Sequence, residues 1–427
     1  MVIGFFIILA ILLVIGTPIF IALSGAVVTY MLWEGGTPLT IVIERLFAGL
    51  DKFSLMSIPF FILTGSLMSF GGLSQRIVNL ANLLVGRFTG GMGMTAVSSS
   101  MFFSAISGSS PATVVAVGSL LYPAMKEQGY KRSFSIGVII ASGSIGIIIP
   151  PSIVMIVYAA VTGVSVGALF MAGLGAGLLY GACFFPYCYY QARKDGVKRS
   201  PAPTAQQLWQ ALKDAAWGLG VPVVVLGGIY GGIFTPTEAA AVAVVYAFCV
   251  SAFIYREKTI SELFGVISGS ATTTAQVMII LAAASVLSWY LTSNGIAVMI
   301  AEQVLSISNN PYHILFLINV TVLIVGMFLD AASIMVILGP LFYVVGIKVG
   351  INPIHLGVVL TVNGAIGMFT PPFGLNLFVA SSVGDVTYLQ AVRGALPFIW
   401  LALFALALLT YIPDISMFLP RLVYSGI

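Results

Sequence analysis

The chain has 427 residues, of which 59% are hydrophobic and only 7% are charged, and its mean hydropathy is +1.11. Soluble domains usually carry about 25% charged residues, so this composition excludes an ordinary soluble domain and indicates an integral membrane protein. The net charge of +4 is low for this length and gives no indication of nucleic-acid binding.

Apolar stretches of membrane-spanning length recur along the chain from Val2 to Pro413. A helix needs roughly 20 residues to cross a bilayer, whereas a membrane β-barrel would show short alternating segments. We therefore expect an all-α polytopic membrane protein with about ten full spans and two hairpins. Residues 2–33 lack the basic region and cleavage site of a signal peptide, so we expect them to be retained, as one long kinked helix or two short helices.

Residues 89–124 are expected to form a first hairpin. They lie between Arg87 and a basic group that starts at Lys126. Basic residues favour the cytoplasmic side of a membrane, so both ends of the segment are expected there. Its two apolar arms are each too short for a full crossing and meet at the sequence SGSS, residues 107–110. This pattern predicts a re-entrant hairpin that enters from the cytoplasm.

The next helix, expected at about 133–165, contains the sequence GIIIPPS at residues 146–152. A proline pair removes backbone donors and breaks a helix. An unpaired carbonyl is costly in hydrocarbon, so non-helical backbone survives at this depth where it lines a cavity or binds a ligand. We expect this broken helix to contribute to a binding site.

The most polar run of the chain, residues 191–215, is predicted to be a cytoplasmic linker between two halves. Threading the spans outward from this run leaves only four of the 17 Lys and Arg residues on the outer side. These four are Arg45, Lys52, Lys348 and Arg421.

The second half is expected to contain the same two features. A second hairpin is predicted at about 311–345 and is bordered by Lys348, so it should enter from outside. A second broken helix is predicted at about 354–385, with the sequence GMFTPPF at residues 367–373. Asp330 lies within the apolar run of the second hairpin.

A constant spacing relates the two halves. Pro371 follows Pro150, and Gly367 follows Gly146, by 221 positions. Matches of Gly and Pro are weak evidence singly, but one sustained offset indicates an internal repeat. We expect residues 1–190 and 216–427 to be inverted repeats, each with scaffold helices, a hairpin and a broken helix. In membrane proteins built from inverted repeats, substrate sites form at broken helices near the bilayer midplane.

The breaks and hairpin tips offer oxygen atoms for cations and free helix N-termini for an anion. We expect two sodium sites and one carboxylate site. The first sodium site is expected to include Ser107, Gly108, Ser110, Ser142, Gly143 and Gly146. The second is expected to include Asp330, Ser333, Asn363, Gly364, Gly367 and Thr370.

Some of these residues also have a purely structural interpretation. Small residues such as Ser142 often serve only to let membrane helices pack closely. Asp330 is harder to explain in this way, because an unpaired carboxylate in hydrocarbon is costly and intramembrane acids are functional candidates. Glu238 could be a helix N-terminal acid. His313 and His355 are expected to be surface residues.

The sequence contains neither an HExxH zinc motif nor a GxxxxGK[ST] nucleotide-binding loop. We therefore expect a protein that is not an enzyme and that takes its energy from an ion gradient.

Five motifs together resemble the large membrane subunit of the tripartite ATP-independent periplasmic transporters. They are GSSPATVVAVG (108–118), GIIIPPS (146–152), GIFTPTEAAAVA (232–243), GMFLDAASIM (326–335) and GMFTPPFGLNLFV (367–379). This resemblance implies a sodium-coupled importer of organic acids, such as C4-dicarboxylates or sialic acids, that works by an elevator motion in the bacterial inner membrane. It also implies two partners, a small four-helix membrane subunit and a periplasmic substrate-binding protein.

The resemblance also implies roles for individual residues. Each hairpin tip with its neighbouring break would hold one sodium ion, and Ser109, Asp330 and Asn376 would lie nearest the substrate. Because Asp330 would repel a carboxylate, we expect it to act through a neighbouring sodium ion or to bind substrate hydroxyl groups.

Two other functions fit the same motifs. One is a sodium/dicarboxylate symporter that needs no binding protein. The other is an ion channel built on re-entrant loops, although paired hairpins within one chain favour alternating access.

Overall fold

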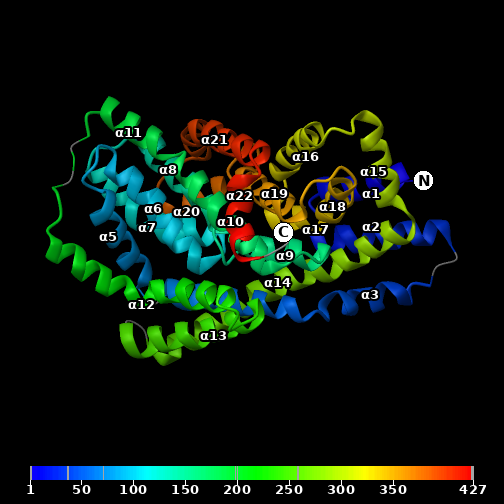
Figure 1. The fold of residues 1–427 in the computed structure, drawn as a ribbon, viewed down its shortest axis with the longest axis horizontal. Helices are drawn as coiled ribbons and strands as arrows, with labels where there is room; N and C mark the ends of the chain where they lie inside the picture. Colours follow the sequence, from blue (N-terminus) through cyan, green and yellow to red (C-terminus); the bar gives the residue numbers. More distant parts are fainter. Residues whose placement is uncertain are drawn as a thin grey trace.

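The computed structural model describes residues 2–35, 38–70, 72–197, 199, 201–256 and 259–424. Over these residues the chain folds into helices and connecting segments, with no β-strand (Figure 1). The predicted all-α class is confirmed.

The helices before the polar linker are α1 (Val2–Val14), α2 (Ile19–Glu34), α3 (Thr40–Leu50), the 3-10 helix η1 (Phe53–Met56), α4 (Ser57–Phe70), α5 (Leu73–Val85), α6 (Gly91–Ser107), α7 (Ser110–Glu127), α8 (Arg132–Gly143), the 3-10 helix η2 (Ser144–Ile147), α9 (Ile153–Thr162), α10 (Val166–Ala182) and α11 (Phe185–Lys194).

The helices after it are α12 (Ala205–Tyr230), α13 (Pro236–Cys249), the π-helix η3 (Val250–Tyr255), α14 (Ile260–Ser293), α15 (Ile296–Ile307), α16 (Pro311–Gly326), α17 (Ala331–Ile337), α18 (Gly339–Lys348), α19 (Pro353–Gly367), α20 (Leu375–Val383), α21 (Tyr388–Tyr411) and α22 (Asp414–Val423).

Six helices of the described chain are long and apolar enough to cross a membrane, or up to eight if each of two bent pairs counts as one span. The chain is therefore a multi-pass membrane protein. The expected count of about ten full spans differs because much of the apolar sequence folds into shorter helices. At the N-terminus, α1 and α2 are two short helices separated by Gly16, whose φ of 79° requires the freedom of glycine.

The helices stop at both proline pairs. After α8 and η2, the backbone from Ile148 to Ser152 is not helical, and the hydroxyl of Ser152 accepts a hydrogen bond from the Met155 amide to cap α9. After α19, the residues from Met368 to Gly374 are likewise not helical. The Pro150–Pro151 and Pro371–Pro372 peptide bonds are both cis.

Each predicted hairpin segment is also divided into shorter helices. α6 and α7 pack against each other and are separated only by Gly108 and Ser109, where Gly108 has a φ of 62°. In the second half, α16 ends at Gly326 and α17 begins at Ala331. α17 and α18 then follow at an angle of 57°.

Helix starts follow the spacing found in the sequence. α7 begins at Ser110 and α17 at Ala331, a difference of 221 positions, and the starts of α8 and α19, Arg132 and Pro353, differ by the same number. The short helix after each break packs on the hairpin of the other half: α9 lies against α17, and α20 lies against α7 (Figure 1). At the centre of the molecule, one short helix from each half therefore packs on the hairpin of the other half.

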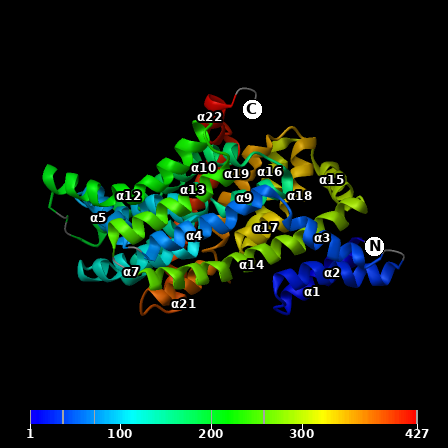
Figure 2. The same cartoon turned by 90° about the horizontal axis from the view of Figure 1, so that it is seen from below.

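α14 is the longest helix of the described chain and runs along one side of the molecule (Figure 2). Its partners include α2, α3, α4 and α17. It therefore connects the N-terminal helices to the centre.

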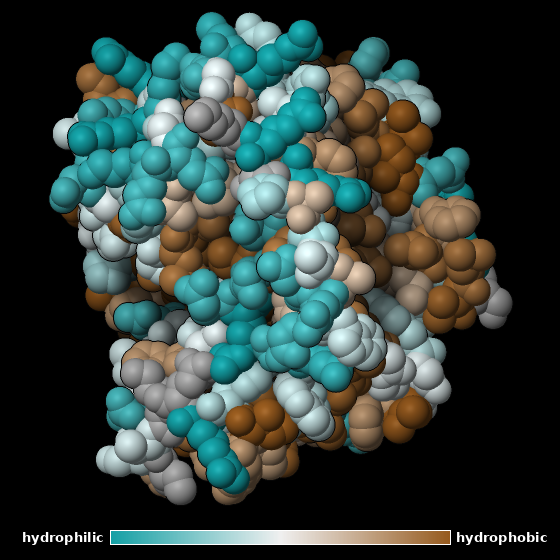
Figure 3. All heavy atoms as spheres, turned by 90° about the vertical axis from the view of Figure 1, so that its left-hand side faces the viewer, coloured by the Kyte–Doolittle hydropathy of each residue, from teal (hydrophilic) through white to brown (hydrophobic). Residues whose placement is uncertain are grey.

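The polar run 191–215 contains the end of α11 and the beginning of α12, which is capped by Thr204 and Gln207. The first part of α12 packs on α5 through Ala211, Ala215 and Leu80. Hydrophilic side chains gather over much of the end of the molecule that these helices form, beside apolar patches (Figure 3).

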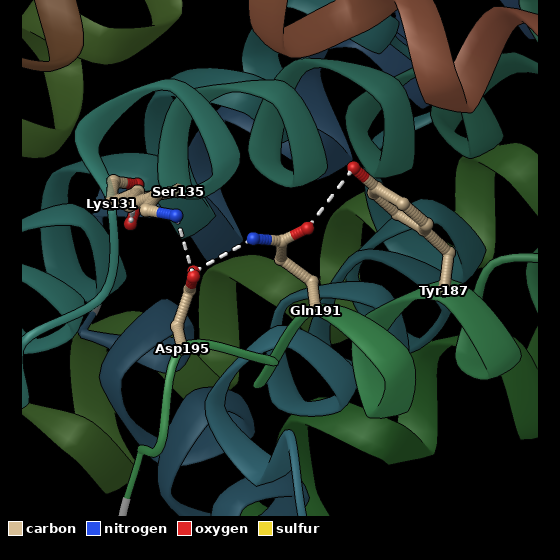
Figure 4. Close-up of polar contacts among 5 residues, drawn as sticks. All are labelled: Lys131, Ser135, Tyr187, Gln191 and Asp195. Carbon is tan, nitrogen blue, oxygen red and sulfur yellow. Dashed lines mark hydrogen bonds and ion pairs between the residues drawn. The ribbon is translucent and has the colours of Figure 1, made fainter. Parts of the chain in front are cut away.

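An ion pair ties the end of α11 to the start of α8 (Figure 4). Lys131 Nζ lies 2.7 Å from Asp195 Oδ1, and Gln191 Nε2 donates to Asp195 Oδ2 at 2.8 Å. The Asp195 side chain is only 5% exposed. Burial alone would raise the pKa of Asp195, but the hydrogen bonds from Lys131 and Gln191, together with nearby positive charge, outweigh it and lower that pKa.

This lowered pKa predicts a pH-dependent contribution to stability. A carboxylate whose pKa is lower in the folded chain stabilises the fold above its unfolded pKa of about 3.9, and this stabilisation is lost as the pH falls through the folded pKa. We expect Asp195→Asn to lower stability at pH 7 by about 1 kcal/mol and to remove this acid dependence. The measurement is the thermal unfolding midpoint of the purified protein between pH 7 and pH 3.

Asp414→Asn is the matched control, because Asp414 pairs with Arg421 with 75% of its side chain exposed. An exposed pair contributes little to stability. Identical pH profiles for Asp195→Asn and the unmodified chain would contradict the prediction.

Candidate functional site

The first break packs directly on the first hairpin tip. A Cβ atom added at Gly146 would lie 2.6 Å from the Ser109 carbonyl oxygen and 2.7 Å from Thr113 Oγ1. A Cβ atom at Gly108 would lie 2.7 Å from the Pro151 carbonyl oxygen. Only glycine allows this approach, so the structure brings the two parts of the expected first site into contact.

The side chains of the first site differ in how fully they are bonded. Ser142 is buried, donates to the Ile139 carbonyl at 3.2 Å and accepts from Ser100 Oγ at 3.1 Å. Ser107 is also buried, yet its hydroxyl has no hydrogen-bond partner within the described ranges. Gly143 packs closely on Val114 of α7. The tip therefore offers a hydroxyl that the protein itself does not use.

Asn376 connects the two halves at this tip. It is fully buried, and its Nδ2 donates to Ser110 Oγ at 2.9 Å and to the Ile140 carbonyl at 3.0 Å. Asn376 follows the second break, whereas Ser110 and Ile140 belong to the first half. The structure thus places Asn376 beside Ser110, the residue that follows Ser109, and its amide links the second break to the first half.

The second break packs on the second hairpin in the same way. A Cβ atom at Gly367 would lie 2.6 Å from the Gly326 carbonyl oxygen, and one at Gly364 would lie 2.9 Å from Ala331 Cβ. Thr370 is buried, and its hydroxyl donates to the Ile366 carbonyl at 2.6 Å. The expected second site is therefore also assembled from one break and one tip.

Asn363 leaves a buried oxygen atom without a donor. Its Nδ2 donates to the Asn319 carbonyl at 2.8 Å and to Asn319 Oδ1 at 3.0 Å. Its Oδ1 is buried and has no hydrogen-bond partner among the described residues. Leaving a buried acceptor unpaired costs about 1–3 kcal/mol. Such an atom beside a helix break fits a ligand that accepts electron density, such as a cation.

Asn319 was not singled out from the sequence. It lies on α16, is half-buried, and its Nδ2 also donates to Thr410 Oγ1 at 2.9 Å. The signal that could have found it is an amide side chain within the apolar run of the second hairpin, which needs a polar partner at that depth.

Asp330 caps α17 at the second tip. Its Oδ2 accepts from the Ala332 amide at 3.0 Å and from the Ser333 amide at 3.2 Å, and its Oδ1 accepts from the Ser333 hydroxyl. A helix N-terminus stabilises a carboxylate, so the structure gives Asp330 and Ser333 a structural role. This role accounts for an acid in an apolar run.

The expectation of a surface histidine is wrong for His355. The side chain is buried beneath α22, where its Nδ1 lies 2.8 Å from Ser416 Oγ and its Nε2 lies 3.3 Å from the Thr410 carbonyl. His313 is exposed, as expected. Glu238 forms a capping box with Thr235 at the start of α13, which is the structural interpretation considered for it.

A cavity of about 830 Å³ borders the first tip. Ser107 and Ser109 line it together with residues of α4 and α14. The part of the chain that the structure describes contains no cluster of His, Cys, Asp or Glu side chains suited to a metal ion.

Residues 6–415 match the family described as the tripartite ATP-independent periplasmic transporter, DctM component. A C4-dicarboxylate TRAP transporter large permease protein from Rhodobacter capsulatus is 40% identical over 425 residues, which cover 96% of this chain and 97% of that protein. An isethionate TRAP transporter permease protein, DctMQ, from Oleidesulfovibrio alaskensis is 42% identical over 410 residues, which cover 96% of this chain and 65% of that protein.

The crystal structure of the Alcanivorax borkumensis YdaH transporter shares the fold, with a TM-score of 0.62 over 90% of this chain and 89% of that chain, at 16% sequence identity. Matches over nearly the whole chain, both to the family and to its curated members, agree with the five sequence motifs. The chain therefore belongs to the large permease subunits of the tripartite ATP-independent periplasmic transporters.

Proposed function

We propose that the protein imports an organic acid together with sodium ions, by an elevator motion of the unit that contains both hairpins. In this proposal it acts with a small membrane subunit and a periplasmic substrate-binding protein. Membership of the family supports solute uptake. Sodium coupling, the motion and the two partners are the parts that we propose.

The unpaired Oδ1 atom of Asn363 carries the proposal of sodium coupling. Sodium is bound by neutral or anionic oxygen atoms, and this atom lies in a helix that ends four residues later at Gly367. The close packing of Gly364 on Ala331 brings the second tip next to it. A cation bound to Asn363 Oδ1 would therefore connect the break to the hairpin.

We propose that the ion site of the first half uses different ligands from the site at Asn363. Ser142 precedes Asn363 by 221 positions, and each contacts the first helix of its own hairpin: Ser142 contacts Ser100, and Asn363 contacts Asn319. The Ser142 hydroxyl already accepts a hydrogen bond from Ser100 and donates one to the Ile139 carbonyl. We therefore propose the backbone of the first tip and break, together with the Ser107 hydroxyl, as the ligands of the first ion, since the Ser110 hydroxyl is bonded to Asn376.

The breaks also supply positive partial charge for a carboxylate. α7, α9, α17 and α20 all begin at a tip or a break, so their N-terminal amides gather near the centre of the molecule. Ser109 is the N-cap residue of α7 and lines the cavity. We propose that an organic acid binds at this tip, close to Ser109 and Asn376.

The substrate and the partners follow by analogy only. The two relatives are named for C4-dicarboxylates and for isethionate and have nearly equal identity to this chain, so an acidic small molecule is the class that we propose. The chain covers only 65% of the DctMQ protein. We infer that the rest of that protein corresponds to the small membrane subunit.

Replacing Asn363 tests whether its side-chain oxygen binds sodium. We expect Asn363→Leu, which keeps the side-chain size but removes the oxygen, to raise the sodium concentration for half-maximal uptake by at least about tenfold, equivalent to about 1.4 kcal/mol. The measurement is initial uptake against sodium concentration in cells that produce the chain with its partner proteins.

Asn352→Ala is the control on the same helix. Asn352 caps α19 by accepting from the Ile354 amide at 2.9 Å, so its loss should reduce stability by about 1 kcal/mol without changing the sodium dependence. Equal sodium dependence of Asn363→Leu and the unmodified chain would remove Asn363 from the ion site.

A second prediction separates capping from ion binding at Asp330. The amide oxygen of Asp330→Asn can still accept the two backbone hydrogen bonds, whereas Asp330→Ala loses the cap and about 1 kcal/mol of stability. We expect Asp330→Asn to unfold near the unmodified temperature but to lose sodium affinity. If its sodium-dependent uptake is unchanged, Asp330 is a structural residue alone.

A third prediction tests the rival functions. In proteoliposomes that contain the chain and its small subunit, we expect saturable, sodium-dependent uptake only when the substrate-binding protein is added outside. Uptake without the binding protein would favour a symporter that needs none. A flux that neither saturates nor requires sodium would favour a channel.

A further inference from the structure

The cavity beside the first hairpin tip has a third wall that belongs to neither hairpin nor break. Its lining comes from α4, from the tip and the start of α7, and from the first half of α14, between Glu262 and Val277. The lining residues of α14 recur every three or four positions and so share one face of the helix. They are Glu262, Gly265, Val266, Gly269, Ser270, Thr273 and Val277.

Two glycines of this face have open space in front of them. A Cβ atom added at Gly265 or Gly269 would meet no atom within 4 Å. Gly65 on α4 is different, because its Cβ atom would lie 3.0 Å from Ser107 Cα and 3.1 Å from the Ser107 carbonyl oxygen. Gly65 thus permits helix packing on the tip, whereas Gly265 and Gly269 face the cavity.

The opposite side of the cavity carries an unused polar group. Ser107 is only 5% exposed and lines the cavity, and its hydroxyl lacks a hydrogen-bond partner in the described chain. This hydroxyl is not among the fully enclosed side-chain atoms without a partner, so a ligand or water in the cavity can bond it. The open glycines therefore face a tip that has hydrogen-bonding capacity to spare.

We propose that the first half of α14 forms the wall along which the substrate passes to and from the first tip, and that Gly265 and Gly269 set the width of this path. This inference rests on the proposed transport function and adds to it residues that determine which substrates fit. In this proposal the path begins beside Glu262 in the first turn of α14 and ends at Ser107 and Ser109 of the first tip.

The two glycines suit this role because neither helix stability nor packing against a described neighbour accounts for them. Glycine within a helix costs about 1 kcal/mol relative to alanine, and no neighbouring atom requires its small size at these two positions. An added Cβ atom meets no neighbour at either position, so we expect a leucine there to extend into the cavity while leaving the helix intact.

The test compares Gly269→Leu and Gly265→Leu with Gly227→Leu. Gly227 lies within α12, is exposed, and would also have no atom within 4 Å of an added Cβ, but it does not line the cavity. Uptake of radiolabelled succinate, isethionate and N-acetylneuraminate is measured in cells that produce the chain with its two partner proteins. The compound that the unmodified chain imports is then used for all variants.

We expect Gly269→Leu and Gly265→Leu to reduce uptake at least tenfold, Gly269→Ala to reduce it less, and Gly227→Leu to stay within twofold of the unmodified chain. Uptake by Gly269→Leu at the rate of Gly227→Leu would overturn the inference. Absence of uptake of all three compounds by the unmodified chain would count instead against the proposed function.

A second measurement examines the cavity without transport. In a chain whose three cysteines are replaced by alanine, Gly269→Cys should react with N-ethylmaleimide. Ala283→Cys on the same helix should not react, because Ala283 is 1% exposed. An unreactive Gly269→Cys would show that no open path exists along α14 and would also overturn the inference.

Discussion

Backbone at a helix break within a membrane protein must be packed or bonded, and this constraint organises the centre of the molecule. At both proline pairs the broken backbone meets a hairpin tip at contact distance. The contacts are made by glycines: Gly146 lies against Ser109 and Thr113, and Gly367 lies against Gly326. A side chain at either position would push the hairpin away from the break, so each glycine maintains the contact between a break and a hairpin.

The two halves meet this constraint with different side chains. In the first half, hydroxyl groups dominate, and Ser142 satisfies its hydrogen bonds through Ser100 and Ile139. In the second half, amides dominate, and the Asn363–Asn319 contact leaves one buried oxygen atom free. Positions 221 residues apart therefore carry different polar side chains, Ser142 and Asn363, with different hydrogen bonds. Beside the second break, Asn363 Oδ1 is buried without a hydrogen-bond donor among the described residues, whereas Ser107 lies at the first tip beside the cavity.

Much of this arrangement could be predicted from the sequence, because proline and glycine act through local backbone geometry. The two PP pairs located the breaks, and the spacing of 221 positions matched the starts of equivalent helices. The environment of His355 could not be predicted, since its burial depends on α22, where its partner Ser416 lies 61 positions further along the chain. The contact of Asn376 with Ser110 likewise joins residues 266 positions apart. Gly265 and Gly269 were not singled out, because only the fold distinguishes a glycine that packs from one that faces a cavity.

The contacts between the halves bear on how the centre could move. Asn376 donates hydrogen bonds to both Ser110 and Ile140. In addition, α9 packs on α17 and α20 packs on α7. Separating α20 from α7 and α8 would leave the buried polar atoms of Asn376 unpaired, at a cost of about 1–3 kcal/mol each. The first tip faces α14 differently, across a cavity of about 830 Å³ lined on that side by glycines without close neighbours. Since Asn376 holds α20 to the first half while the first tip faces α14 across this cavity, we propose that the hairpins and breaks move together against α14 rather than apart from each other.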